Sequence, residues 1–197
     1  MCNRFWWPEF ERSSVFDFHR VVNEPDFLPL PFVRHLTQAA TLLRKHKGHL
    51  KISPAGRRMI EEPNIQALQA VLFHVAIWHF DLGVLGRDLH RGWLQRDAGI
   101  ILWSLSVSAN DWQPPARLSR LCTIPINGVL DQQWDTASYA MEAQILRPLQ
   151  WFGLLEHREE KTDNGDFTNR HFYRKTATFD RFLSFDVRLE NADAPRH

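Results

Sequence analysis

The chain has 197 residues, 44% of them hydrophobic, and its eight Trp and fourteen Phe supply ample material for a well-packed interior. Its two cysteines, Cys2 and Cys122, exclude a disulfide framework and indicate a reducing compartment. The net charge of +1 predicts no class of partner by itself, and the N-terminus has no apolar run behind a basic start. We therefore expect a cytoplasmic protein with no membrane partner.

Residues 1–31 are predicted to form an aromatic N-terminal arm. Four prolines interrupt this stretch, and its Phe and Trp side chains suit an arm that is laid across another surface. That surface is either the protein's own core or a partner protein. Trp6 and Trp7 are the candidate partner-binding residues.

Residues 32–63 are predicted to form a first small unit. Apolar residues at helical spacing indicate a helix over 32–45, ended by Gly48. The alternation in His49–Ser53 predicts one short, half-exposed strand. Ser53 followed by Pro54 is a typical helix start, with Ser as the cap and Pro in the first turn.

Residues 64–134 are predicted to be a central helical region. Residues 64–82 and 98–109 are apolar nearly all round, which favours helices buried inside a domain. His74 and His79 are candidate metal ligands. On a helix, however, their side chains would point in directions about 140° apart, so they should not share a face. We therefore expect core or boundary histidines and no metal.

Residues 135–186 are predicted to form a second unit, followed by a tail over 187–197. A helix over 136–152 contains Pro148, which should kink or shorten it, and Gly153 should end it. Two polar, alternating runs around Asn164-Gly165 predict a β-hairpin, and Thr176 should cap a last helix. The overall expectation is a mainly α fold with small β-hairpins.

The sequence contains the same order of elements twice: a helix, Leu-Leu, a charged strand or hairpin, and a capped helix. Its two copies are LLRKHKGHLKISPAGRRMI (42–60) and GLLEHREEKTDNGDFTNRHFYRKT (153–176). Both stretches resemble the winged-helix superfamily, in which a β-hairpin wing follows a helix-turn-helix. The resemblance implies two winged-helix-like units joined by a buried helical middle. It also implies a nucleic-acid-binding or protein-docking role, between which fold alone does not choose.

Charge distribution favours nucleic acid at the first unit. Residues 32–60 contain seven of the 24 Lys and Arg and no acid, which leaves 17 against 23 acids elsewhere, a net charge of −6. The alternative is a solvated helix face with a basic end. A polar stripe running from residue 34 through 45 could lie along a groove, with the other cations on the phosphates. The candidate nucleic-acid-binding residues are Arg34, Gln38, Arg44, Lys45, Lys47, Lys51, Arg57 and Arg58.

The second hairpin region, residues 156–175, has balanced charge and an acidic tip, which favours protein contact or solvent over DNA. No nucleotide-binding loop, nucleophile motif or paired metal-binding motif is present, so no cofactor is expected. We predict a non-enzymatic nucleic-acid-binding protein, with duplex DNA as the favoured partner and transcription regulation in bacteria as the role. The alternatives are a protein-interaction module, homodimers included, and, least favoured, a metal-dependent enzyme.

Overall fold

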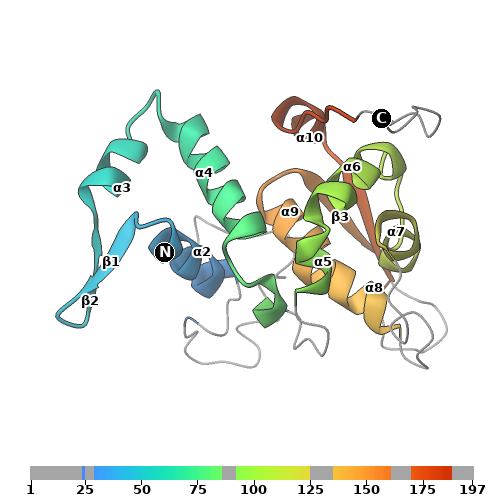
Figure 1. The fold of residues 1–197 in the computed structure, drawn as a ribbon, viewed down its shortest axis with the longest axis horizontal. Coiled ribbons are helices and arrows are strands. Elements are labelled where there is room, and N and C mark those ends of the chain that lie inside the picture. Colours follow the sequence, from blue (N-terminus) through green and yellow to red (C-terminus); the bar gives the residue numbers. More distant parts are fainter. Residues whose placement is uncertain (1–23, 25–28, 86–91, 125–134, 161–169, 188–197) are drawn as a thin grey trace, which may run out of the picture.

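The computed structural model describes residue 24 and residues 29–85, 92–124, 135–160 and 170–187. The fold is mainly α-helical with two small antiparallel hairpins, as predicted, and the hairpins lie toward opposite ends of the molecule (Figure 1). The elements are α2 (Pro29–Ala39), β1 (Leu43–His46), β2 (His49–Ile52), α3 (Pro54–Met59), α4 (Ile65–Trp78), η2 (Leu82–Leu85), α5 (Trp93–Arg96), α6 (Ala98–Ser108), α7 (Pro115–Cys122), α8 (Thr136–Met141), η3 (Glu142–Leu146), α9 (Arg147–Trp151), β3 (Leu155–Glu160), β4 (Arg170–Lys175) and α10 (Ala177–Phe182).

The first unit contains a complete hairpin, which corrects the prediction of a long helix and one strand. Helix α2 ends at Ala39 because Thr41 adopts a left-handed conformation (φ 58°). The amide of Leu42 then donates to the Thr37 carbonyl at 2.9 Å, which closes a Schellman-type cap. Lys47 (φ 49°) and Gly48 (φ 81°) form the two-residue turn that joins β1 to β2. Positive φ at both turn positions matches the right-handed twist of the strands.

The second unit contains a helix that runs through Pro148 instead of stopping before it. Segments α8, η3 and α9 are continuous, and η3 is a π-helical turn immediately before Arg147. Because a π turn changes which amides must donate, it accommodates a residue that has no N–H. Gly153 (φ 71°) then ends α9, and β3 pairs with β4, as the sequence predicted. The turn at Asn164-Gly165 lies outside the described residues.

The two units share the same local hydrogen bonds. Ser53 donates its amide to the Leu42 carbonyl at 2.9 Å, and Thr176 donates to the Leu154 carbonyl at 3.0 Å. The hydroxyl oxygens of Ser53 and Thr176 then cap α3 and α10, as predicted. Each unit is therefore a helix, a left-handed residue, Leu-Leu, a hairpin and a capped helix. The repeated sequence pattern corresponds to a repeated local structure.

Aromatic contacts join the first unit to the rest of the core. The Phe32 ring of α2 lies 4.9 Å from the Trp151 ring of α9. Phe73 of α4 makes edge-to-face contacts with Phe152 at 5.5 Å and with Phe182 of α10 at 5.2 Å. Rings at these separations and angles attract one another beyond their burial alone. Helices from both ends of the sequence therefore meet in one core.

The two all-apolar helices are not fully buried, contrary to the prediction. Helix α4 leads from the first unit into the body (Figure 1), and Ile65 near its start is 61% exposed. Only its later part faces the core, through Phe73, Ala76 and Ile77. On α6, Val107 is likewise 61% exposed. Each helix has more apolar surface than its described neighbours cover. Within the described ranges, no helix is long and apolar enough to span a membrane.

Candidate functional site

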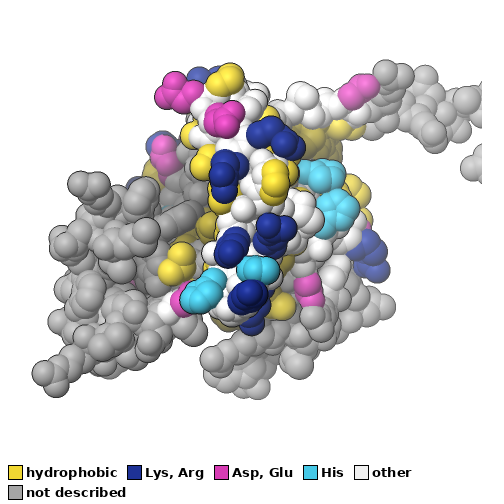
Figure 2. Space-filling model, turned by 90° about the vertical axis from the view of Figure 1, so that its left-hand side faces the viewer, with side chains coloured by type: hydrophobic (Ala, Val, Ile, Leu, Met, Phe, Trp, Pro, Cys, Tyr) yellow, Lys and Arg dark blue, Asp and Glu magenta, His cyan; other side chains and the backbone are white. Residues whose placement is uncertain are grey.

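Six of the eight predicted nucleic-acid-binding residues lie together on the hairpin β1–β2 and on α3. All six side chains are exposed. Figure 2 shows Lys and Arg side chains following one another down this face of the molecule, from α3 to the hairpin. The six are Arg44, Lys45, Lys47, Lys51, Arg57 and Arg58. We call this set the cationic face, and within it Lys45 projects from the opposite side of the hairpin to Arg44 and Lys51.

The hairpin places two of these cations directly opposite each other. Arg44 pairs with Lys51 across the strands, while Lys45 pairs with Leu50 on the other side of the ribbon. Like charges directly opposite each other destabilise a hairpin. Among the described residues, no carboxylate lies within 4.0 Å of any member of the cationic face. Its positive charge is therefore not compensated by the described part of the chain.

Helix α3 carries Arg57 and Arg58 in its last turn. Cations at that end complement the helix dipole, which is their ordinary structural role. The side chain of Ser53 accepts from the Gly56 amide at 2.9 Å and fixes where the helix begins. Because α3 follows β2 after this single residue, its arginines continue the positive surface of the hairpin. The exposed Glu61 and Glu62 follow α3 and limit that surface at its end.

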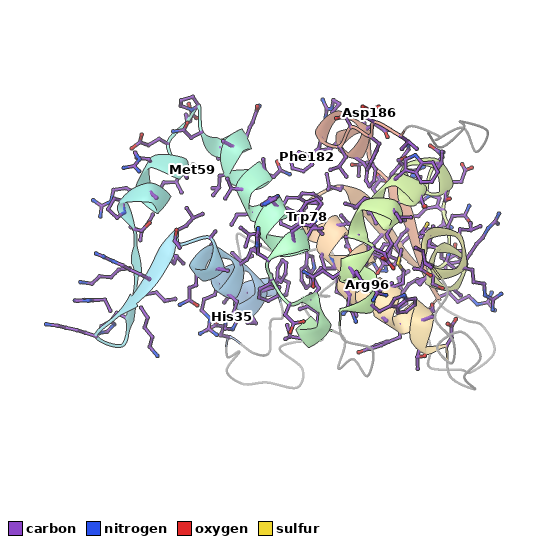
Figure 3. The ribbon with its side chains drawn as sticks, in the orientation of Figure 1. His35, Met59, Trp78, Arg96, Phe182 and Asp186 are labelled. Atoms are coloured by element: carbon purple, nitrogen blue, oxygen red, sulfur yellow. The ribbon has the colours of Figure 1, made fainter. Side chains whose placement is uncertain are left out.

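The structure does not bring Arg34 and Gln38 into the cationic face. Both lie on α2, where Gln38 is half-buried and the Nε of Arg34 lies 2.7 Å from a Glu24 carboxylate oxygen. The predicted stripe from 34 to 45 is interrupted because α2 ends at Ala39 and Lys45 belongs to β1 (Figure 3, where His35 marks α2). An arginine beside a carboxylate contributes less to a positive potential than a free one.

We expect Lys51→Glu to stabilise the protein while weakening any polyanion binding. The change replaces a like-charge pair opposite Arg44 by an opposite-charge pair. The free energy of unfolding should rise by about 0.5 kcal/mol, measured by urea titration. Lys51→Gln is the control and should give a smaller gain. A loss of stability in both variants would show that the Arg44–Lys51 repulsion is already relieved within the protein.

Three of the four described cations on the second hairpin are paired. Arg158 contacts Glu160 at 2.7 Å, Arg174 contacts Glu156 at 2.6 Å, and Lys175 contacts Asp180 at 2.9 Å. In addition, the guanidinium groups of Arg158 and Arg174 lie 4.9 and 4.7 Å from the centre of the Trp112 ring. These contacts hold the arginines against the protein and offset their charge. Only Arg170 on β4 has no described carboxylate within 4.0 Å, so the second hairpin carries less uncompensated charge than the first.

A hydrogen-bonded cluster joins the second hairpin to the π turn. His157 Nε2 and His171 Nδ1 are 2.8 Å apart, with the rings stacked. Tyr173 donates to Glu142 Oε1 at 2.9 Å, and His171 Nδ1 lies 3.4 Å from the same oxygen. Burial, followed by the charge of His171, lowers the pKa of His157 below its ordinary value of 6.5.

This cluster should make stability depend on pH. Because the pKa of His157 is lower in the folded protein, the unfolded chain takes up the proton first as the pH falls. The contribution of His157 to stability is thus complete above pH 6.5 and is lost as the pH falls through the folded pKa. Glu142 and Glu159 oppose the shift, and Arg147 reinforces it.

Urea unfolding at pH 7.5 and pH 5.0 measures the effect. The wild-type protein should lose more unfolding free energy between these pH values than His157→Gln does. Equal losses would mean that the acid sensitivity arises elsewhere in the chain.

The predicted separation of His74 and His79 is wrong. Their Nε2 atoms are 3.2 Å apart, because α4 ends at Trp78 and the non-helical backbone of His79 turns its ring back. Two imidazoles alone do not make a typical protein metal centre. Within the described ranges, no three His, Cys, Asp or Glu residues are grouped so that they could hold an ion.

Of the two cysteines, the structure describes Cys122. Cys122 is a free, buried thiol on α7, and burial raises its pKa to about 11. Such a thiol is a poor nucleophile at neutral pH. Cys2, together with the candidate partner-binding residues Trp6 and Trp7, lies outside the described residues.

Comparison with known proteins gives a family match at the start of the chain. Residues 1–65 match the family model of the Y4jL N-terminal domain. The match covers one third of the 197 residues and ends at Ile65, where α4 begins. It therefore includes the whole of the first hairpin unit and its cationic face. No curated protein and no solved structure matches the chain.

Proposed function

We propose that this is a non-enzymatic nucleic-acid-binding protein that contacts duplex DNA through the cationic face. The observation that carries the proposal is the gathering of six exposed cations on one short hairpin and the helix after it. Arg44 and Lys51 are directly opposed there, with no described carboxylate within 4.0 Å. Such an arrangement costs stability in the free protein. Binding of an anionic partner relieves this repulsion, and the free energy recovered in this way favours binding.

The chemistry of this face suits phosphate groups. Lys and Arg side chains on an exposed ribbon can each approach one phosphate, and each such contact releases a condensed counterion. Because all six cations are exposed, their contacts set position and affinity, with base edges read by other groups. The half-buried Gln38 on α2 is a candidate for such a role.

The order of elements from α2 onward supports a winged-helix assignment for the first unit, in which one helix precedes the hairpin among the described residues. In the first unit, α2 precedes a two-stranded hairpin, and a capped helix follows it. In the winged-helix superfamily such a hairpin is the wing, and a wing that carries uncompensated cations is suited to the DNA backbone. We further propose that the protein regulates transcription in a bacterial cytoplasm, where duplex DNA is present.

A salt series tests the proposal directly. The dissociation constant for a fluorescein-labelled random 20-base-pair duplex is measured by anisotropy between 50 and 400 mM NaCl. With up to six phosphate contacts, the logarithm of the affinity should fall against the logarithm of salt with a slope of about −5. Absence of binding at 50 mM NaCl, to duplex DNA and to RNA alike, removes the proposal.

A protein-interaction module is the second candidate, supported by the outer side of α6. Ile100, Trp103 and Val107 are 49%, 41% and 61% exposed, and they recur at helical spacing on a helix without a charged residue. An exposed apolar stripe of this kind is typical of protein contacts, homodimers included. The salt series separates the two candidates, because a docking module of this type has no affinity for a duplex.

A further inference from the structure

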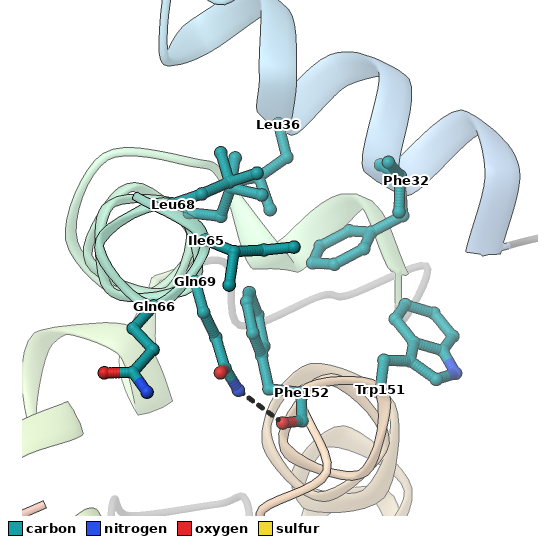
Figure 4. Close-up of a pocket in the computed structure, with 10 residues that line it drawn as sticks. Phe32, Leu36, Ile65, Gln66, Leu68, Gln69, Trp151 and Phe152 are labelled. Atoms are coloured by element: carbon teal, nitrogen blue, oxygen red, sulfur yellow. Dashed lines mark hydrogen bonds between the residues drawn. The ribbon is translucent and has the colours of Figure 1, made fainter. Parts of the chain in front are cut away.

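An apolar cavity of about 390 Å³ lies between the first unit and the body of the protein. Figure 4 shows Phe32 and Leu36 from α2, Ile65 and Leu68 from α4, and Trp151 beside Phe152 at the end of α9 around one hollow. Volumes above about 300 Å³ are typical of sites for small organic molecules. The cavity is thus large enough to take a ligand.

The walls of the cavity are held in place by contacts with one another and with the Phe73 and Phe80 rings behind them. Phe32 stacks at a tilt on Trp151 at 4.9 Å and meets Phe80 edge-on at 5.6 Å. Phe152 is fixed by the Phe73 ring at 5.5 Å and by Gln69, whose Nε2 donates to the Phe152 carbonyl at 3.0 Å (Figure 4). These contacts keep the three helices apart, so the cavity is largely formed before a ligand binds.

The lining selects for an uncharged molecule. None of the described residues that line the cavity is Asp, Glu, Lys, Arg or His, and most are aliphatic or aromatic. A charged ligand would lose its hydration there with no counter-charge to replace it. Since Gln69 uses its Nε2 on the protein, its Oε1 is left to accept from a ligand N–H or O–H.

The mouth of the cavity exposes apolar surface. Ile65 and Val33, which both line it, are 61% and 37% exposed. A ligand that fills the cavity would also cover these side chains and remove them from water. We propose that the protein binds a neutral, largely apolar small molecule here, with one hydrogen-bond donor directed at Gln69. This site is separate from the cationic face, so the inference does not rest on the proposed function.

N-phenyl-1-naphthylamine, a neutral fluorophore with one N–H donor, is the probe. Titration into the full-length protein, with direct excitation of the probe, should give saturable binding at one site per chain. Val33→Trp, which fills the mouth, should weaken binding at least about 10-fold. Val71→Trp is the matched control, because Val71 is also 37% exposed on a helix but does not line the cavity. It should bind as the wild-type protein does.

Competition on the wild-type protein tests the ligand class without any variant. 1-Decanol should displace the probe, whereas decanoate, an anion without a donor, should be at least about 10-fold weaker. Unsaturable binding, equal affinity in Val33→Trp and wild type, or equal competition by alcohol and carboxylate would each overturn the proposal. A variant with Arg44, Lys45, Lys47 and Lys51 replaced by Gln should retain probe binding, so a failure of the nucleic-acid proposal is distinguishable from a failure of this one.

Discussion

Replacing Arg44, Lys45, Lys47 and Lys51 together by Gln should lower affinity for a random DNA duplex on the order of 10³-fold at 0.1 M salt. Each lost phosphate contact removes about 0.9 from the salt slope, so the slope should fall from about −5 to about −2. Arg57 and Arg58 would supply the contacts that remain. The anisotropy salt series measures both quantities in the same titration.

A second set of four exposed arginines provides the control for net charge. Arg96, Arg117, Arg120 and Arg181 lie on α5, α7 and α10, away from the cationic face in the sequence and on other elements. Replacing these four by Gln removes the same formal charge and should change affinity less than about 10-fold. If both quadruple variants lose affinity equally, binding follows the overall charge of the protein, and the cationic face is not its site.

Gly56→Ala should destabilise the protein by about 3 kcal/mol. A Cβ at this position would lie 2.3 Å from the Leu42 carbonyl oxygen and 3.0 Å from Ile52 Cγ1. The Leu42 carbonyl is backbone and already accepts from the Ser53 amide, so neither side of the contact can move cheaply. Overpacking of this kind costs about 1 to 3 kcal/mol, and more where the backbone must shift. Urea unfolding followed by circular dichroism measures it.

Gly99→Ala is the matched control for that experiment. Gly99 also lies in a helix, but outside its own helix backbone no described atom stands within 4 Å of the Cβ it would carry. Because Ala loses less backbone freedom on folding, this variant should be more stable by about 0.5 to 1 kcal/mol. The contrast also bears on the site. Gly56→Ala separates α3 from the hairpin and should weaken duplex binding, whereas Gly99→Ala should leave it unchanged. Similar stabilities for the two variants would show that α3 does not pack as closely on Leu42 as the structure has it.

Local signals in the sequence account for much of the fold. Ser53 and Thr176 cap their helices, and Gly153 ends α9 in the left-handed conformation. These features depend on one or two residues and their own backbone, so sequence reasoning reaches them. The first hairpin was missed for a related reason. Thr41 ends α2 in a conformation that β-branched residues rarely adopt, and the turn signal at Lys47-Gly48 was interpreted as a helix end.

The candidate site was predicted in part. The six cations of the cationic face were named from the absence of acids over residues 32–60, and the described structure gathers them on neighbouring elements. Arg34 was named with them, but Glu24 lies against it. The cavity carried no sequence signal, because its lining comes from three helices that are distant in the chain.

By itself, the sequence determined the helical character, the second hairpin, the helix caps at Ser53 and Thr176, and the uneven distribution of charge. Each of these depends on residue type and short spacing. Only the tertiary structure decided which apolar faces stay exposed, how His74 reaches His79, and that α2, α4 and α9 enclose a cavity. Those outcomes depend on where helices stop and how rings from distant segments pack. Close packing is a property of whole side-chain sets, and no local stretch specifies it.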